Sequence, residues 1–329
     1  MRVFLTGATG LLGSHLAEHL VERGHDVVAL VRATSDTSFL DSLGVRLVRG
    51  DVTDSVEQLS ALMVGCSHVV HGAALVYSGG GWDAVAEVNV EGTYRVLMAA
   101  ATSGAQKAVN ISSVAAYPGS ELQYDQDSPP PAAARIVGDD YARSKREAEV
   151  VARRVERNTG LVVTTVRPSA VYGERDRLLA PAIAALLRSP IVPLFGSGDN
   201  TLPVVYAGNV AVAIGIILGS PLGGDSYDLG MDHPLTQRSL FRELALGMGL
   251  ARRFFSVPAS SVRFGARLFS RMGAKTPGAR HLSLERVARL ALDENPYLSR
   301  KAHLDLGWDP PHRHDDALER TGRWLVARQ

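Results

Sequence analysis

A chain of 329 residues is long enough for a dinucleotide-binding domain and roughly a hundred or more residues of other structure. Its formal net charge of +1 argues against a nucleic-acid partner or an anionic membrane surface, and no apolar run approaches the ~20 residues that span a bilayer. The single cysteine, Cys66, excludes an internal disulfide, so we expect a soluble, unsecreted protein in a reducing cytoplasm.

Short β-rich runs alternate with amphipathic stretches through the first half of the chain, a pattern typical of a parallel sheet covered by helices. The expected fold class is therefore α/β, with a doubly wound parallel sheet. In chain order, strands are predicted at 3–5, 27–31, 45–48, 69–70, 108–111 and 161–166, and helices at 11–23, 82–101 and 140–157.

The pattern changes beyond Arg167, where prolines are frequent and the elements are shorter. We predict a dinucleotide-binding domain over residues 1–166 and a smaller, mostly helical substrate-binding part over residues 167–329, some segments of which return to the sheet. Residues 123–136 contain three consecutive prolines and no periodicity, which indicates a loop and a candidate flap over the site. Helix-like runs within the second part occur at 181–187, 210–218 and 239–248.

A glycine-rich turn lies directly between the first predicted strand and the first predicted helix, with its glycines spaced G-x-x-G-x-x-G. Such a turn lets backbone N–H groups and the helix N-terminus meet a pyrophosphate. An ordinary tight turn is the alternative, but the position after the first strand favours a Rossmann-type dinucleotide site. Its predicted residues are Gly7, Thr9, Gly10, Leu11, Leu12 and Gly13.

The second predicted strand ends at Arg32, where an NAD-selective site usually carries an acidic residue that accepts from the ribose 2′-OH. Arg32, with Thr34 and Ser35 just beyond, instead offers donors suited to a 2′-phosphate. NADP(H) is therefore expected in preference to NAD(H), although a solvent-exposed arginine without a ligand is the alternative. Asp51 and Val52 follow the third strand, where Asp51 is placed to accept from the adenine amine.

Tyr141 and Lys145 are four residues apart on a predicted helix, so they lie on the same face. An ammonium beside a phenol favours the phenolate and prepares it to exchange a proton near neutral pH. Ser112 and Ser113 follow the fifth predicted strand, at the edge where open α/β sheets bind ligands. A serine hydroxyl there can hold a carbonyl or alcohol oxygen. With a dinucleotide site, these groups predict hydride transfer to or from a C–O carbon.

These motifs resemble the extended short-chain dehydrogenase/reductase family, which includes sugar-nucleotide epimerases, dihydroflavonol reductases and 3β-hydroxysteroid dehydrogenases. The resemblance covers essentially the whole chain. The similar segments are Thr6–Gly13, Gly50–Asp54, His71–Ala74, Asn89–Thr93, Ile111–Ser113, Tyr141–Lys145, Arg167–Gly173, Val204–Tyr206 before Asn209, and Lys301–Pro310.

The resemblance implies that Tyr141 is the general acid/base, that Lys145 binds the nicotinamide ribose and tunes Tyr141, and that Ser113 orients the substrate. Asn89 would tie a helix to the sheet beside the cofactor, with a purely structural role as the alternative. In many relatives the helix at 140–157 forms a homodimer interface. Further cofactor contacts are implied for Ala73, Ala74, Pro168, Ser169 and Val171.

Departures from the family pattern narrow the expected activity. Dehydratases place Asp-Glu after the serine or threonine, whereas Ser113 is followed by Val-Ala-Ala. Sugar-nucleotide epimerases usually carry an Arg-Asp pair where this chain has residues 199–203 without a cation. This argues against a diphosphate substrate, with compensation by Arg252, Arg253 and Arg263 as the alternative. Apolar or aromatic side chains instead predict an apolar or aromatic carbonyl substrate, with core packing as the alternative. The candidate substrate residues are Val76, Tyr77, Trp82, Val114 and Tyr172.

The expected activity is therefore NADPH-dependent reduction of a ketone or aldehyde, or the reverse oxidation. The alternatives are a sugar or sugar-nucleotide epimerase, a 3β-hydroxysteroid-type dehydrogenase and, least favoured, a dinucleotide sensor without catalysis. No metal site is expected, because His312 and His314 lack a cysteine or carboxylate cluster of matching spacing. His68 and His71 are expected to be packed neutral imidazoles.

Overall fold

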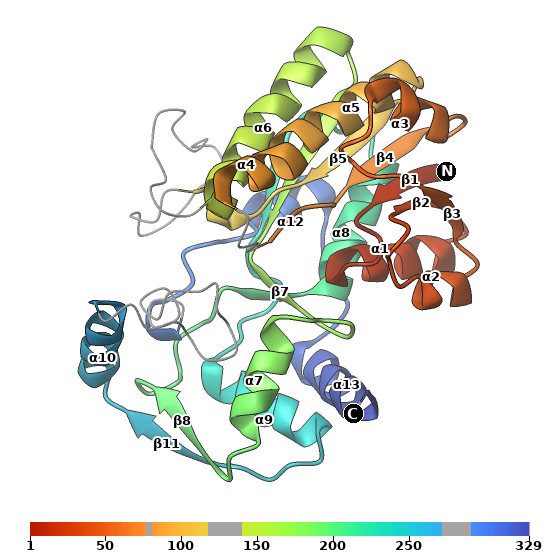
Figure 1. Cartoon of the computed structure of the whole chain (residues 1–329). Helices are drawn as coiled ribbons and strands as arrows, with labels where there is room; N and C mark the ends of the chain where they lie inside the picture. The colour runs from red at the N-terminus through yellow and green to blue at the C-terminus, as the bar shows by residue number, and fades with distance from the viewer. Residues whose placement is uncertain (77–80, 118–139, 272–290, 329) are drawn as a thin grey trace. The chain divides into compact units, whose positions relative to one another are not determined.

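The computed structural model describes residues 1–76, 81–117, 140–271 and 291–328 (Figure 1). The chain forms two compact units. The first comprises Met1–Ser169, Ala207–Leu229 and Tyr297–Asp309, and the second comprises Ala170–Tyr206, Gly230–Pro296 and Pro310–Gln329. Two stretches from beyond residue 167 therefore belong to the first unit. The predicted flap at 123–136 lies outside the described residues.

The first unit contains a seven-stranded parallel sheet in the order β10-β6-β5-β4-β1-β2-β3. This confirms the doubly wound parallel sheet expected from the sequence. The order reverses between β1 and β4, and ligands of such sheets bind at the carboxyl ends of the strands beside this reversal. The strands are β1 (Arg2–Thr6), β2 (Asp26–Val31), β3 (Arg46–Arg49), β4 (His68–His71), β5 (Lys107–Ile111), β6 (Val162–Pro168) and β10 (Ser226–Leu229).

Strand β10 has no counterpart among the predicted strands. It pairs in parallel with β6, with Tyr227 opposite Val166 and Asp228 opposite Arg167. Its four residues are too few to show a period of their own, and two of them are polar. The strand exists because long-range pairing with β6 satisfies its backbone groups, which a local sequence pattern does not indicate.

Helices cover both faces of this sheet, with α3, α5 and α6 side by side on one face and α1 against α8 on the other (Figure 1). The predicted helix at 82–101 is observed as three consecutive pieces, in which a π-helical turn at Glu87–Glu91 separates two α-helical segments. The helices are α1 (Leu11–Glu22), α2 (Ser38–Ser42), α3 (Val56–Leu62), α4 (Gly81–Ala86), the π-turn η1, α5 (Gly92–Thr102), the 3₁₀ turn η2 (Val114–Ala116), α6 (Asp140–Thr159), α8 (Ala207–Gly219) and α12 (Arg300–Leu306).

The core between the sheet and α3, α5 and α6 is built from the aliphatic side chains of the strands and of the inward helix faces. Phe4, Leu59, Met63 and Leu97 are fully buried there. Cys66 packs in the same cluster, and burial raises the pKa of its thiol. Among the described helices, none combines the length and the apolar character needed to cross a bilayer.

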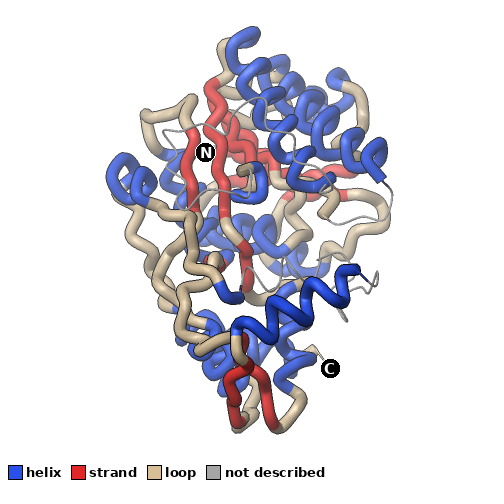
Figure 2. Tube along the Cα trace, turned by 90° about the vertical axis from the view of Figure 1, so that its left-hand side faces the viewer, coloured by secondary structure: helices blue, strands red, loops and turns tan. Residues whose placement is uncertain are grey.

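The second unit has short strands as well as helices, and Figure 2 distinguishes them by colour. Its strands form two parallel pairs, β7 (Ala170–Tyr172) with β9 (Val204–Tyr206) and β8 (Ile191–Phe195) with β11 (Arg253–Val257). Among the residues that the structure describes, its helices are α7 (Leu179–Leu187), α9 (Gln237–Gly247), α10 (Ala259–Arg271) and α13 (His314–Ala327).

Helices α9 and α13 of the second unit approach each other backbone to backbone. A Cβ atom on Gly247 would lie 2.3 Å from the carbonyl oxygen of Glu319, and one on Gly322 would lie 2.7 Å from the carbonyl carbon of Gly247. The core beside this crossing contains Leu187, Leu194 and other large side chains. The two glycines are therefore required by close packing.

Candidate active site

The glycine turn after β1 packs tightly against the end of β4. Gly7 has a φ of +75°, and a Cβ atom on it would lie 2.6 Å from the carbonyl carbon of Gly72. A Cβ atom on Gly13 would lie 2.1 Å from the carbonyl oxygen of Gly7. Any side chain at either position would displace the turn, so the sequence has glycine there for steric reasons.

The amino end of α1 follows the carboxyl end of β1. Gly10 is its N-cap in extended conformation, and no side chain caps the helix through this residue. The turn is closed by Gly10 N–H donating to Gly7 O at 3.0 Å, while Thr9, Leu11 and Leu12 are half-buried. The first-turn N–H groups and the helix dipole therefore fit the negative charge of a dinucleotide pyrophosphate.

A buried hydrogen-bond chain supports this turn from behind. Thr93 Oγ1 donates to Asn89 O at 2.7 Å, so it must accept from His71 Nε2 at 3.0 Å. His71 Nδ1 then accepts from Thr6 Oγ1 at 2.8 Å, and Thr6 Oγ1 accepts the N–H groups of Gly72 and Ala73. Burial, and then the charge of Lys145, lower the pKa of His71 to about 3, so this imidazole is neutral.

The residues predicted for the adenosine end lie at the carboxyl ends of β2 and β3. Arg32 is exposed, and within the described part of the chain its side chain has no hydrogen bond or ion pair. Arg49 lies beside it and donates from Nη1 to Arg32 O at 2.8 Å. Asp51 is half-buried and accepts from Thr53 N and Oγ1 at 3.0 and 2.9 Å, whereas Val52 is buried in the core.

Tyr141 and Lys145 occupy consecutive turns of α6, as their spacing predicts. Tyr141 is half-buried, and Lys145 Nζ lies 5.9 Å from the centre of its ring. Lys145 is buried and donates from Nζ to Ile111 O at 2.7 Å, so it meets the end of β5 just before the serine pair. Burial lowers the pKa of Lys145 to about 8, against the opposing effect of the Glu149 charge.

The two serines after β5 have different surroundings. Ser112 is buried and donates its hydroxyl to Glu149 Oε1 at 2.6 Å. Ser113 is half-buried, and its Oγ accepts from Ala115 N–H at 3.1 Å. Accepting that bond leaves the hydroxyl hydrogen of Ser113 able to donate to a ligand, whereas the hydrogen of Ser112 is already used.

A buried ionic cluster lies beside these residues and was not anticipated from the sequence. Arg167 on β6 makes two 2.8 Å bonds to Glu149 on α6, and Asp228 on β10 accepts from Arg167 Nη1 at 3.3 Å and from Tyr117 OH at 2.7 Å. Burial raises the pKa of Asp228, against the opposing charge of Arg167. One signal was available, an arginine at the end of the apolar strand run 161–166.

The end of β6 carries further candidates for cofactor contact. Pro168 closes the strand, and Ser169 follows it with a buried Oγ that has no hydrogen-bond partner among the described residues. Such a hydroxyl fits a ligand that brings a polar group to it. Ala73 and Ala74 are half-buried after β4. Val171 belongs to the second unit.

The candidate substrate residues are divided among different surroundings. Trp82 at the start of α4 is half-buried, with the Arg143 guanidinium 3.5 Å from its ring centre. Val76 is exposed, and Val114 is buried against Tyr117. Tyr77 lies outside the described residues.

Tyr172 is buried in the second unit. Its hydroxyl pairs with His314 Nδ1 at 2.7 Å, while His314 Nε2 lies 3.1 Å from Asp232 Oδ1. These contacts tie β7 to the start of α13. They show a structural part for Tyr172 and His314 within this unit.

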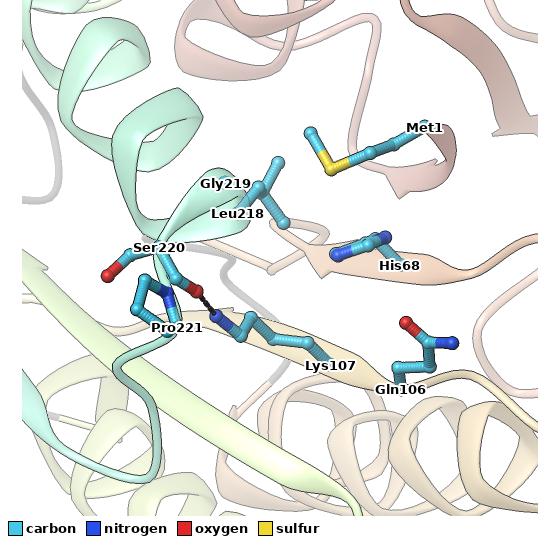
Figure 3. Close-up of a pocket in the computed structure, with 8 residues that line it drawn as sticks. All are labelled: Met1, His68, Gln106, Lys107, Leu218, Gly219, Ser220 and Pro221. Atoms are coloured by element: carbon cyan, nitrogen blue, oxygen red, sulfur yellow. Dashed lines mark hydrogen bonds between the residues drawn. The ribbon is translucent and has the colours of Figure 1, made fainter.

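A hollow of about 480 Å³ lies at the opposite, amino edge of the sheet, beside the starts of β4 and β5 (Figure 3). Lys107 Nζ lies in it and donates to the carbonyl oxygens of Ile217, Ser220 and Leu222. An ammonium has three N–H donors, so Lys107 is fully used in capping the end of α8. The described site residues of the first unit lie at the other edge.

Comparison with known proteins agrees with this geometry. A model of the NAD dependent epimerase/dehydratase family matches residues 3–230. The chain is 30% identical over 269 residues, 77% of each chain, to a 2-alkyl-3-oxoalkanoate reductase of Stenotrophomonas maltophilia. It is 28% identical, over 98% of its own length and 97% of the relative's, to a 4-hydroxy-2-methyl-3-oxo-4-farnesyl-3,4-dihydroquinoline-1-oxide ketoreductase of Stigmatella aurantiaca.

Among solved structures, a dTDP-glucose 4,6-dehydratase from Streptomyces venezuelae with NAD and TYD bound is similar, with a TM-score of 0.74 and 25% identity over 99% of this chain and 97% of that one. The resemblance stated from the sequence motifs is thereby confirmed. The chain belongs to the NAD dependent epimerase/dehydratase family and is an NAD(P)-dependent oxidoreductase of the extended short-chain dehydrogenase/reductase type.

Proposed function

We propose that the protein is an NADPH-dependent reductase of a ketone or aldehyde carried by an apolar or aromatic small molecule. The observation that carries the proposal is the hydrogen bond that Lys145 Nζ donates to Ile111 O at 2.7 Å. This bond joins the helix that carries Tyr141 to the strand end that carries Ser113, beside the glycine turn. Tyr141 and Ser113 are thus linked to one edge of the sheet, which supports their proposed roles as proton donor and oxygen-holding hydroxyl.

The residues of the chain have distinct tasks in this reaction. Ser113 donates its hydroxyl hydrogen to the substrate oxygen and orients the carbonyl. A bound nicotinamide dinucleotide supplies the hydride or, in the reverse direction, accepts it. Tyr141 gives its proton to the oxygen as negative charge develops there, and the neighbouring Lys145 ammonium stabilises the phenolate that remains.

Reduction is preferred to dehydration because of the residues that come directly after Ser113. An elimination of water from a sugar needs a further acid and base beside the serine. Here the 3₁₀ turn η2 contains Val114, Ala115 and Ala116, and Val114 is buried. None of these side chains exchanges a proton. The relatives named as a reductase and a ketoreductase support the same preference.

The preference for NADPH rests on two arginines. Arg32 and Arg49 lie side by side at the carboxyl ends of β2 and β3, and Arg32 is exposed without an acidic partner among the described residues. A guanidinium binds a phosphate through two parallel N–H bonds, whereas a ribose 2′-OH is better matched by a carboxylate. An NAD-bound relative shows only that the fold accepts a nicotinamide dinucleotide.

The test is loss of NADPH absorbance when purified protein is mixed with aromatic, steroidal and aliphatic ketones and aldehydes. We expect turnover with NADPH that falls about 10²–10⁴-fold in Tyr141→Phe, the range that general acid catalysis contributes, while NADPH still binds the variant. Tight NADPH binding without net oxidation, together with conversion of one sugar epimer into another, would contradict reduction and establish the epimerase alternative.

A further inference from the structure

The ionic cluster beside Lys145 is buried to an unusual degree. The side chains of Arg167, Glu149 and Asp228 are 2%, 1% and 1% exposed. Burying ions costs several kcal/mol each unless partners replace the lost water. Within the described residues this cluster lies directly behind the carboxyl ends of β5 and β6, where the reaction is proposed to occur.

Glu149 is the member of the cluster that bonds to Ser112, beside the candidate site. It is four residues after Lys145, so the two side chains follow each other on one face of α6. Its Oε1 accepts from Arg167 Nε and from Ser112 Oγ, and its Oε2 accepts from Arg167 Nη2. It therefore also holds Ser112, the residue directly before Ser113.

The charge of Glu149 is only partly neutralised by Arg167. That guanidinium is shared with Asp228, to which it donates from Nη1. A further cation near Glu149 is Arg153, whose Nη1 is 3.6 Å away but whose side chain is 44% exposed and therefore screened by water. A buried carboxylate that is shared in this way retains a field that acts on Lys145.

Lys145 needs such a field to remain an ammonium. It is buried, it donates to the neutral carbonyl of Ile111, and His71 behind it carries no charge. Tyr141 faces it one turn earlier. Desolvation favours the neutral amine, and among the charges near Lys145 it is Glu149 that raises its pKa.

We propose that Glu149 is a positioning residue for the Tyr141–Lys145 pair, which keeps Lys145 protonated inside the protein and fixes the strand end that carries Ser113. Its catalytic relevance rests on the function proposed above. The ion pair with Arg167 supplies the rigid frame, and the residual charge of Glu149 acts on the ammonium one turn away. Loss of that charge leaves Lys145 able to shed its proton nearer to neutral pH.

The chain is well suited to a direct test, because it has only the four lysines Lys107, Lys145, Lys275 and Lys301. Selective ¹³C labelling of lysine with NMR titration of the Cε signals follows each amine separately, and Lys145→Met assigns the signal. In Glu149→Gln we expect the titration midpoint of Lys145 to fall by about 1 pH unit. The pH at which kcat/KM declines on the basic side of its profile should be lower by the same amount.

Two further substitutions distinguish this electrostatic role of Glu149 from a general loss of stability. Glu147→Gln is the same change on the same helix, but Glu147 pairs at the surface with Arg143, so the Lys145 midpoint should stay in place. Asp228→Asn disrupts the cluster from β10 and should destabilise the fold while moving the midpoint less than Glu149→Gln does. If Glu149→Gln fails to fold, Glu149→Asp replaces it. Its shorter side chain moves the carboxylate, so the Lys145 midpoint should fall by less than about 1 pH unit but below the wild-type value, and an unchanged midpoint would overturn the proposal.

The possible outcomes are distinct. An unchanged Lys145 midpoint in Glu149→Gln, or an equal shift in Asp228→Asn, would overturn the proposal. A shifted midpoint without reductase activity in the wild-type protein would leave the electrostatic coupling standing and remove the proposed function. A shift of both the midpoint and the pH profile supports the two together.

Discussion

Replacing Gly13 with alanine should damage dinucleotide binding, because the added methyl group does not fit against the glycine turn. The new Cβ atom would lie 2.1 Å from Gly7 O and 2.8 Å from Ala8 Cα, both backbone atoms that cannot rotate away. Ordinary contact begins near 3.4 Å, so α1 must withdraw by about 1 Å. Overpacking of this kind costs about 1–3 kcal/mol. The same displacement moves the N–H groups of the helix end away from the pyrophosphate.

The assay is urea unfolding of Gly13→Ala with and without NADPH, together with titration of NADPH by fluorescence. We expect about 1–3 kcal/mol lower stability of the free protein and at least tenfold weaker binding. Gly219→Ala is the matched control, because its added Cβ meets nothing within 4 Å at the end of α8, and it should match wild type in both measurements. Wild-type NADPH affinity in Gly13→Ala would refute the close-packing argument.

Two other predictions concern charge. Arg32→Asp should weaken NADPH binding about ten- to a hundredfold, from the loss of about 1.5–3 kcal/mol of charged hydrogen bonding, while NADH binding is retained. The control is Arg46→Asp, a change at an exposed residue at the start of β3, which should alter the affinity for neither cofactor. Equal losses of NADPH and NADH affinity in Arg32→Asp would contradict a 2′-phosphate site. For His71, the folded pKa of about 3 lies below the ordinary 6.5, so the unfolded chain takes up the proton first as pH falls. Stability should therefore decline between pH 6.5 and 3 by up to about 1.4 kcal/mol per unit from this group, and His71→Gln should unfold in urea with a shallower pH dependence.

The parts of the fold that could be predicted from the sequence are those that depend on local residue patterns. The alternation of β-rich runs and amphipathic stretches is local, and it led to the six strands from β1 to β6. The π-turn was missed because its cause is not local. The buried Asn89 side chain hydrogen-bonds with the N–H and C=O groups of Leu75 and with the hydroxyl of Ser144. A helical hydrophobic period does not predict these three contacts.

The candidate site divides in the same way. The spacings of Gly7, Gly10 and Gly13, and of Tyr141 and Lys145, are short-range and could be read directly. The cluster of Glu149, Arg167 and Asp228 joins a helix and two strands that are far apart in the chain, so only the folded sheet brings it together. Arg49 was overlooked because its neighbour Arg32 is reached across the β2–β3 pairing.

The chain passes between its two units repeatedly, after Ser169, Tyr206, Leu229, Pro296 and Asp309. Neither unit is therefore formed by one contiguous stretch of sequence that a single recombination or cloning step could exchange. A graft of the second unit must carry three stretches at once, and a circular permutant opened at any one of these passages would leave the others covalently joined. Variation in such a protein is expected to accumulate by substitution within the second unit rather than by recombination of whole segments.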